Sequence, residues 1–184
     1  MGGIEVTDLN GKGPYIYKVN HMHMHGASEH RFDGVQHDLE IHIVHELVDG
    51  PADYKSYKET LAVVGILFKI DKVSHPFIEK LKPENFGHID KINLAELLCP
   101  VDKADLSPDE QQQALQKSPF YHYKGSLTNP PCAEVVNWIV HREVLPITIE
   151  HLEALKSIWI EYLGFDNFRE CQPLAGRRVV RNFH

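Results

Sequence analysis

The sequence predicts a mainly β (α+β) fold, in which a central, largely antiparallel twisted sheet carries short peripheral helices. Four runs rich in Val, Ile and Tyr and bounded by Gly, Pro or Asp are typical of strands: residues 15–19, 39–45, 61–70 and 135–141. No internal repeat or low-complexity linker divides the chain. We therefore expect residues 1–184 to form a single domain.

The third of these runs indicates the middle of the sheet. Residues 61–68 are apolar on both faces, which is typical of a strand that is covered on both sides. Two helices are predicted at the periphery. One begins at Ser107, which is followed three residues later by a capping-box Glu110, and the other begins near Thr148. The second helix places three apolar residues at helical spacing: Leu152, Leu155 and Trp159.

The overall composition argues against several classes of protein. The 184 residues include 19 Lys and Arg against 26 Asp and Glu, a formal charge of −7, and the basic residues are scattered. We therefore expect no nucleic-acid partner. No apolar run approaches the ~18 residues of a membrane span, and the first residues lack a signal-peptide pattern. Three cysteines are too few for a disulfide scaffold and do not select a compartment.

Histidine is the unusual component, because 13 residues are His and several fall between positions 21 and 45. In His21-Met22-His23-Met24-His25 the residue types alternate, so a strand here would place all three imidazoles on one face. The run that begins at Asp38 places three further residues on one face: Glu40, His42 and Val44. Such a density of imidazoles on neighbouring strands predicts metal or proton chemistry.

Zinc geometry limits how these histidines can act together. Zinc holds nitrogen at about 2.0–2.1 Å, whereas positions i and i+4 of a strand lie roughly 13 Å apart. One ion can therefore take two neighbours, His21 with His23 or His23 with His25, and His42 from the adjacent strand. Three histidines leave a fourth position open to water, and Glu40 is placed to accept a ligand's spare N–H. The alternative is a set of surface histidines, or an adventitious metal patch.

Six segments together resemble the α-class carbonic anhydrases, and the resemblance covers nearly the whole chain. They are His23-Met24-His25, Ser28-Glu29-His30, Glu40-Ile41-His42-Ile43-Val44-His45, Tyr121-His122-Tyr123-Lys124-Gly125-Ser126-Leu127-Thr128-Asn129-Pro130-Pro131-Cys132, Val136-Asn137-Trp138-Ile139-Val140 and Asn167-Phe168-Arg169-Glu170-Cys171-Gln172-Pro173-Leu174. The resemblance implies the sheet of that family and a single zinc ion. It selects as ligands His23, His25 and His42.

Position by position, the resemblance also implies the roles of the surrounding residues. Glu40 supports His42, His21 stands where the family usually has a Gln bonded to the first ligand, and Asn167 stands where a backbone carbonyl orients the second. Thr128 resembles the residue whose hydroxyl accepts from zinc-bound hydroxide, and Glu29 the carboxylate that receives the Thr proton. The remaining matches correspond to the substrate pocket: Val44, Val63, Leu127, Asn129, Val136 and Trp138.

The function implied by the resemblance is reversible hydration of carbon dioxide to bicarbonate and a proton by zinc-bound hydroxide. Carbon dioxide carries no charge, so an apolar wall is the surface expected to hold it. The alternative is a zinc-binding structural or assembly subunit that derives from a carbonic anhydrase and has little or no activity. The three histidines, Glu29 and Thr128 together favour the enzyme, because scaffolding needs no open coordination position.

The chain departs from the family at its start. The first matched ligand is His23, whereas family members have roughly a further third of the domain before it, including sheet strands and the histidine that relays protons. The resemblance therefore implies an N-terminally truncated domain. Three explanations are open: an incomplete sequence, a natural short form, or a subunit whose missing wall comes from another chain. We expect the uncovered sheet edge to pair with a second copy or a partner chain, or to aggregate. In many secreted and bacterial members the cysteine after Pro-Pro pairs within that portion, so Cys132 has no expected partner. His21 is the one candidate substitute for the proton relay.

Overall fold

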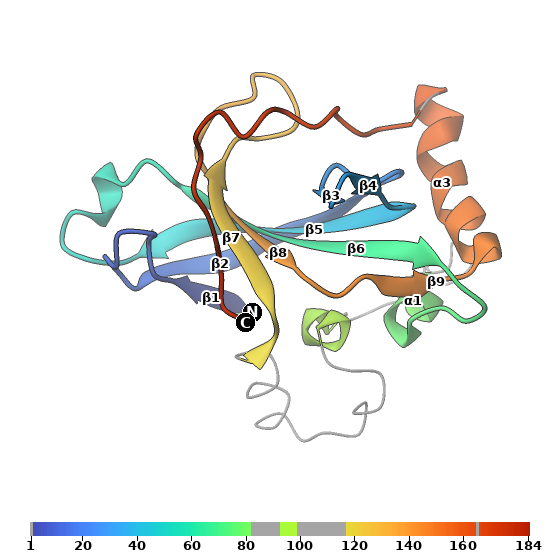
Figure 1. Ribbon diagram of the computed structural model, residues 1–184, viewed down its shortest axis with the longest axis horizontal. Coiled ribbons are helices and arrows are strands. Elements are labelled where there is room, and N and C mark those ends of the chain that lie inside the picture. Colours follow the sequence, from blue (N-terminus) through green and yellow to red (C-terminus); the bar gives the residue numbers. More distant parts are fainter. Residues whose placement is uncertain (1, 82–92, 99–116, 165) are drawn as a thin grey trace.

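The computed structural model describes residues 2–81, 93–98, 117–164 and 166–184. Eight of the described strands form one curled sheet in the order β1-β2-β5-β6-β8-β7-β10, with β9 beside β6 (Figure 1). The strands are β1 (Gly3–Val6), β2 (Tyr15–His25), β5 (Leu39–Asp49), β6 (Leu61–Ile70), β7 (Phe120–Gly125), β8 (Val136–His141), β9 (Leu145–Ile147) and β10 (Val179–Arg181). The predicted mainly β class is confirmed.

Most neighbouring strands of this sheet run antiparallel, as expected. Among the described strands, β6 pairs in parallel with β8 and β9, and the other pairings are antiparallel. A second, two-stranded sheet consists of β3 (Arg31–Phe32) and β4 (Val35–Gln36), which lie above the main sheet in Figure 1. The apolar run at residues 61–70 is β6, a central strand whose residues 62–68 are all buried.

Strand alternation divides the side chains of β5 between two faces of the sheet. Leu39, Ile41 and Ile43 enter the apolar core that also receives the helices. The residues between them face the other way, where Val44 joins a second buried cluster. This alternation separates His42 from the helix-covered core and directs it to the face that carries the candidate site.

Two described α-helices pack on the first of these faces. α3 (Ile149–Leu163) begins after Thr148, whose side chain accepts a hydrogen bond from the His151 N–H. The predicted second helix is therefore confirmed, and its three apolar residues are buried: Leu152, Leu155 and Trp159.

The other described helices are short. α1 (Pro76–Lys80) lies below the sheet in Figure 1, and the two 3-10 helices are η1 (Tyr54–Ser56) and η3 (Leu94–Leu97). The helix predicted at Ser107 lies outside the described residues.

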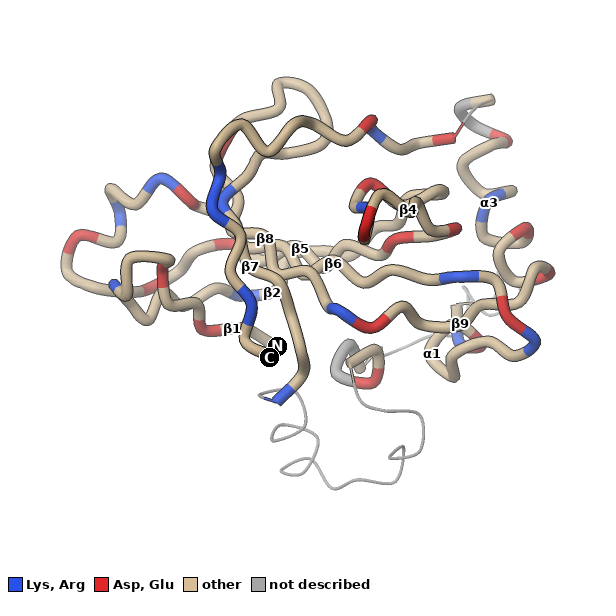
Figure 2. The backbone as a smooth tube through the Cα atoms, in the orientation of Figure 1, with Lys and Arg blue, Asp and Glu red and all other residues tan. Residues whose placement is uncertain are grey.

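Charged residues occur along most of the described chain. Figure 2 shows Lys and Arg interspersed with Asp and Glu along most of the chain, with basic residues along the C-terminal segment. Within the described ranges, none of the helices combines the length and apolar character needed to cross a bilayer.

Candidate metal centre

Three histidines from two adjacent strands converge on one face of the sheet. β2 supplies His23 and His25, and β5 supplies His42, which is the direct register partner of His23. One ring nitrogen from each residue lies within 4.8 Å of the others, a spacing that allows all three to reach one ion. The ring centroids lie 5.0 Å apart for His23 and His25, and 4.7 Å apart for His25 and His42.

Hydrogen bonds outside the cluster direct the ligand nitrogens toward its centre. His25 Nδ1 lies 2.6 Å from the Asn167 carbonyl oxygen, so Nδ1 carries the proton and Nε2 keeps the lone pair. His42 Nε2 lies 2.8 Å from Glu40 Oε1, which leaves Nδ1 as the free acceptor. His25 Nε2 and His23 Nδ1 are buried without any hydrogen-bond partner. Buried imidazole nitrogens without partners fit a site that binds a metal ion.

Burial keeps two of these imidazoles in the form that binds metal. Burial, followed by the repulsion of neighbouring His42, lowers the pKa of His23 to about 3. Burial also lowers the pKa of His25, although Glu29 and the Asn167 carbonyl act in the opposite direction. Both rings are therefore neutral near pH 7, and a neutral imidazole is the form that coordinates zinc.

Glu40 is fully buried and accepts four hydrogen bonds. Its Oε1 accepts from His30 Nδ1 at 2.6 Å and from His42 Nε2 at 2.8 Å, and its Oε2 accepts from the backbone N–H groups of Glu29 and His30, each at 2.8 Å. Burial alone would raise the pKa of Glu40, but His30 and His42 lower it well below its usual value. The absence of a side chain at Gly65 leaves room for the Glu40 carboxylate, because a Cβ at residue 65 would lie 2.9 Å from Glu40 Oε1.

Glu29 presents one fixed and one free carboxylate oxygen. Its Oε1 accepts a 2.7 Å hydrogen bond from the Arg169 backbone N–H. Its Oε2 is buried without a hydrogen-bond partner, 3.5 Å from His25 Nε2 and 4.0 Å from His42 Nδ1. Thr128 lines a cavity together with Glu29, but the two described side chains form no hydrogen bond in this conformation. The structure therefore brings the two residues to one cavity without the hydrogen bond that the resemblance implies.

Asn167 forms a hydrogen bond to the ligand that it was expected to support, whereas His21 does not. His21 is exposed, and its Nδ1 lies 2.9 Å from Asn20 Oδ1. The rings of His21 and His23 stack with centroids 5.3 Å apart, and these two described residues share no hydrogen bond. The Asn167 side chain, by contrast, accepts from the Gly26 N–H at 3.1 Å and donates to the Met24 carbonyl at 2.9 Å. These contacts attach the C-terminal segment to the end of β2.

Most of the expected apolar wall forms one cluster next to the histidines. Four of its residues are buried: Val44, Val63, Val136 and Trp138. Leu127 is half-buried and packs against them. The Trp138 and His42 rings lie 4.7 Å apart between centroids. Asn129 is exposed, and its carbonyl accepts from the Cys132 N–H at 2.8 Å.

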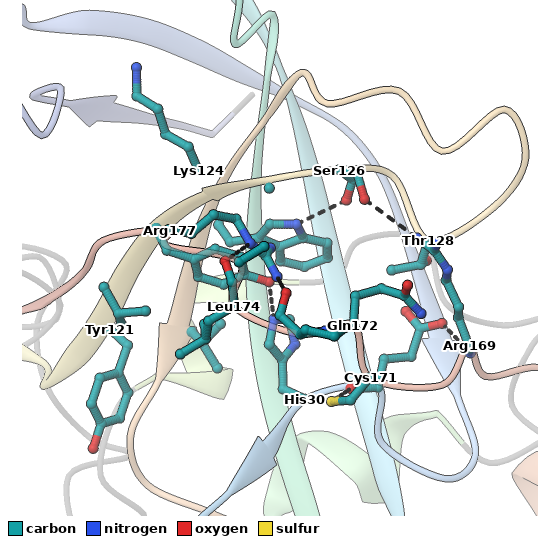
Figure 3. A pocket seen from close by; sticks show the side chains of 18 of the residues that line it. His30, Tyr121, Lys124, Ser126, Thr128, Arg169, Cys171, Gln172, Leu174 and Arg177 are labelled. Atoms are coloured by element: carbon teal, nitrogen blue, oxygen red, sulfur yellow. Dashed lines mark hydrogen bonds between the residues drawn. The ribbon is translucent and has the colours of Figure 1, made fainter.

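A cavity of about 870 Å³ lies next to this centre, and the three histidines are not part of its lining. Figure 3 shows His30 and Cys171 on one side of it, with Arg177 and Leu174 across from them. Sequence reasoning assigned no role to three residues that the structure connects to the site: His30, Gly65 and Arg169. The segment Ser28-Glu29-His30 was the available signal for His30, because it follows the second ligand closely.

A second group of metal-binding residue types is His30, Glu40 and His42, whose ligand atoms also lie within 4.8 Å of one another. In this group the facing atoms already bond to each other, at 2.6 Å and 2.8 Å. The first group keeps its nitrogens free, so it is the better candidate for a metal.

Comparisons with known proteins identify the family. The family model for eukaryotic-type carbonic anhydrases matches residues 4–183. The chain belongs to the α-carbonic anhydrase family. It is 32% identical to alpha carbonic anhydrase 3 of Arabidopsis thaliana over 90% of this chain and 53% of that protein. It is 29% identical to human mitochondrial carbonic anhydrase 5A over 97% of this chain and 61% of that protein.

Solved α-carbonic anhydrases share the fold. The enzyme from Thermovibrio ammonificans, solved with the inhibitor sulfanilamide, is 31% identical with a TM-score of 0.62, and the match covers 90% of this chain and 63% of that one. Cah3 from Chlamydomonas reinhardtii, solved with acetazolamide, is 25% identical with a TM-score of 0.66, covering 94% and 68%. The chain thus spans about half to two thirds of the length of the relatives that it matches.

Proposed function

We propose that this carbonic anhydrase family member catalyses the reversible hydration of carbon dioxide to bicarbonate and a proton, with one zinc ion held by His23, His25 and His42. The observation that supports this proposal is the convergence of three ring nitrogens within 4.8 Å of one another. Two of the three rings are held by hydrogen bonds that direct a free lone pair inward. Three imidazoles without a fourth protein ligand are typical of a catalytic rather than a structural zinc site.

Zinc held by three neutral imidazoles would acidify a water molecule and supply a nucleophile near neutral pH, the chemistry for which carbonic anhydrases are the standard example. The residues around the ligands maintain the geometry. Asn167 fixes the ring of His25 through its carbonyl, and Glu40 fixes the ring of His42 through its carboxylate. Such outer contacts hold the tautomer and increase the basicity of the ligands.

Glu29 and Thr128 are the residues proposed to orient the nucleophile. Glu29 is held by the Arg169 backbone N–H and keeps one buried oxygen free, so this oxygen is available to accept a hydrogen bond from the Thr128 hydroxyl. A hydroxyl that donates to Glu29 has its own lone pairs left to accept a hydrogen bond from the nucleophile. This arrangement would aim the nucleophile at carbon dioxide, which we propose lies against the apolar wall at Val63 and Trp138.

Proton transfer to solvent is needed to complete each turnover. His21 is exposed beside His23, with ring centroids 5.3 Å apart, and is the candidate carrier. We expect turnover to be limited by proton export and to rise as imidazole is added at fixed pH and ionic strength. A rate that is already high, does not respond to imidazole and is lost in His21→Ala would identify His21 as an efficient carrier.

Stopped-flow measurement of carbon dioxide hydration on protein of known zinc content tests the proposal. Zinc-loaded protein should hydrate carbon dioxide well above the buffer rate, and His42→Ala should lose both zinc and activity. His21→Ala is the matched control for zinc content, because it removes a neighbouring imidazole of the same strand without removing a proposed ligand. A zinc-loaded protein without activity at every imidazole concentration would contradict the enzyme proposal.

The second candidate is a zinc-binding structural or assembly subunit with little activity. One observation favours it: β1 pairs with β2 only from Tyr15 to Lys18, so residues 20–25 of β2 have β5 on one side and no described strand on the other. An open strand edge beside the site favours pairing with a second copy or a partner chain. Sedimentation over a wide concentration range tests this candidate, and a stable monomer throughout would argue against it.

A further inference from the structure

We propose that a clamp of charged side chains holds the loop that carries Thr128, and that Lys124 is a positioning residue that acts through Thr128. The Thr128 loop is residues 126–135, between the end of β7 and the start of β8. The clamp consists of five residues: Asp8, Lys58, Glu59, Lys124 and Glu134. The inference rests on the proposed function for the role of Thr128, and it goes beyond that function by assigning residues outside the metal centre.

Two consecutive residues contact the two ends of the Thr128 loop. Glu59 Oε2 lies 3.0 Å from the Nζ of Lys124, two residues before the loop begins. Lys58 Nζ lies 3.3 Å from Oε2 of Glu134, near the end of the loop. All four residues line the cavity that Thr128 also lines, and Figure 3 shows Lys124 and Thr128 at this cavity. One short segment therefore holds the loop at both ends.

The Lys124 end of the clamp is largely buried. The Lys124 Nζ also lies 2.8 Å from Asp8 Oδ1, and the side chains of Asp8 and Glu59 are only 6% and 7% exposed. Burial opposes the charged form of Lys124, but its hydrogen bonds to Asp8 and Glu59 raise its pKa. Burial likewise opposes the charged form of Asp8, and Lys124 lowers the pKa of this carboxyl. Loss of the Lys124 ammonium would remove a counter-ion from two buried carboxylates.

The Glu134 end of the clamp is exposed. The side chains of Lys58 and Glu134 are 63% and 76% exposed. Water and salt screen such a pair, so it contributes little to holding the loop. We therefore expect substitution of Lys124 to loosen the loop far more than substitution of Lys58.

The sheet alone does not hold this end of β7 on both sides. β10 pairs with β7 at residues 121–123, so among the described strands only β8 lies beside Lys124. Two hydrogen bonds are internal to the loop: the Leu127 N–H donates to the Ala133 carbonyl at 3.0 Å, and the Cys132 N–H donates to the Asn129 carbonyl at 2.8 Å. The clamp joins this loop to the segment before β6, which is separate in sequence.

Amide hydrogen exchange in the metal-free protein tests the clamp without zinc or activity. In Lys124→Met the Leu127 and Cys132 amides should exchange about 10-fold faster relative to the Ile41 amide of β5, because hydrogen bonds to charged groups are lost. Lys124→Arg keeps the charge and should recover most of the protection. Equal acceleration at all three amides would show a general loss of stability, and it would overturn the proposal.

Two further variants complete the exchange experiment. Lys156→Met is the matched control, because Lys156 forms a 2.8 Å ion pair with Asp166 and is exposed to a similar degree, at 26% against 31% for Lys124. It should leave the exchange of the Thr128 loop unchanged. Glu59→Gln removes one charge of the clamp and keeps an oxygen acceptor, so it provides the test if Lys124→Met fails to fold. Unchanged loop exchange in Glu59→Gln would then overturn the proposal.

A double-mutant cycle tests whether Lys124 acts through Thr128. In zinc-loaded protein, Lys124→Met should lower kcat for hydration about 10-fold with zinc retained, because the hydroxyl is no longer held in position. In a Thr128→Ala background the same substitution should have no further effect. An equal loss in both backgrounds would overturn the assignment of Lys124. If the zinc-loaded unchanged protein is inactive, the proposed function fails, and the exchange experiment alone decides the clamp.

Discussion

The sheet carries two buried polar clusters, the metal centre on one face and a second cluster on the opposite face. Strand side chains contribute to both, but the clusters differ in whether their buried polar atoms have hydrogen-bond partners. The second cluster, the Asn137 network, consists of Tyr17, Tyr57, His122 and Asn137. Asn137 accepts from His122 Nε2 at 3.1 Å and donates to Tyr17 Oη at 3.0 Å, and Tyr17 donates to the Glu59 carbonyl at 2.7 Å. No described polar side-chain atom of this network is buried without a partner.

The metal centre leaves three such atoms unpaired, on His23, His25 and Glu29. A buried polar atom without a partner costs stability, so a protein retains one where a ligand or reaction requires it. The Asn137 network instead joins β2, β7, β8 and the segment at residue 57, and it leaves no buried polar side-chain atom of its described residues without a hydrogen-bond partner. The contrast supports the proposal that the first cluster binds a metal ion, whereas the second contributes to stability. Substitutions in the two clusters should therefore have separable effects.

The largest expected effect is the loss of metal in His42→Ala. Two histidines on one strand cannot hold zinc as tightly as three, so stoichiometric zinc should be lost at micromolar metal and hydration should fall to the buffer rate. Metal analysis after dialysis measures this directly, with His21→Ala as the variant that keeps its zinc. Zinc content unchanged after substitution of His23, His25 and His42 together would refute the site.

The next effect separates chemistry from binding within the metal centre. Thr128→Ala should retain zinc while hydration falls about 10²-fold, because the nucleophile is no longer oriented. Thermal unfolding should remain close to that of the unchanged protein, since the Thr128 side chain forms no hydrogen bond in the described structure. Equal losses of zinc and activity would assign Thr128 to structure rather than to catalysis.

Val63→Tyr tests the apolar wall in the same assay. The added ring should fill the space against Trp138 that we propose for carbon dioxide, so turnover should fall strongly with zinc retained. A variant with unchanged turnover would show that the substrate lies elsewhere.

The Asn137 network should show the reverse pattern. Asn137→Ala removes the shared partner of Tyr17 and His122, so the free energy of unfolding should fall by about 2 kcal/mol. Urea unfolding of the zinc-free protein measures this change, and zinc stoichiometry should be unchanged after refolding. A variant that keeps its stability but loses zinc would contradict the division between the two clusters.

The smallest expected effect is the pH dependence of stability. Burial lowers the pKa of His122, as it does for His45 and His141. These imidazoles stay neutral in the folded state, while the unfolded chain takes up protons below its ordinary pKa of about 6.5. Stability should therefore be complete above pH 6.5 and decrease as the pH falls below it, as measured by urea midpoints between pH 7.5 and 5. His122→Gln should reduce the slope, and an unchanged slope would exclude His122 as a contributor.

Local patterns predicted much of the architecture before any coordinates were considered. The alternation in residues 21–25 and 38–45 predicted that the histidines of each strand share one face, and β2 and β5 are indeed adjacent strands with His23 opposite His42. The apolar run at residues 61–68 predicted a central strand, and Thr148 predicted the start of α3. Periodicity works in these cases because strand alternation and helix capping are properties of a few neighbouring residues.

Other features depended on contacts between distant parts of the chain. Residue spacing alone did not choose between His21 and His25 as partners of His23, and it did not show that Asn167 contacts a residue 142 positions away. It also did not reveal that Glu40 is shared between His30 and His42, or that Gly65 provides the space for this arrangement. The sequence by itself determined which side chains share a face of each strand, because that follows from the backbone. Only the tertiary structure decided which atoms meet, because the strand register, the packing of β6 and the path of the C-terminal segment set those distances.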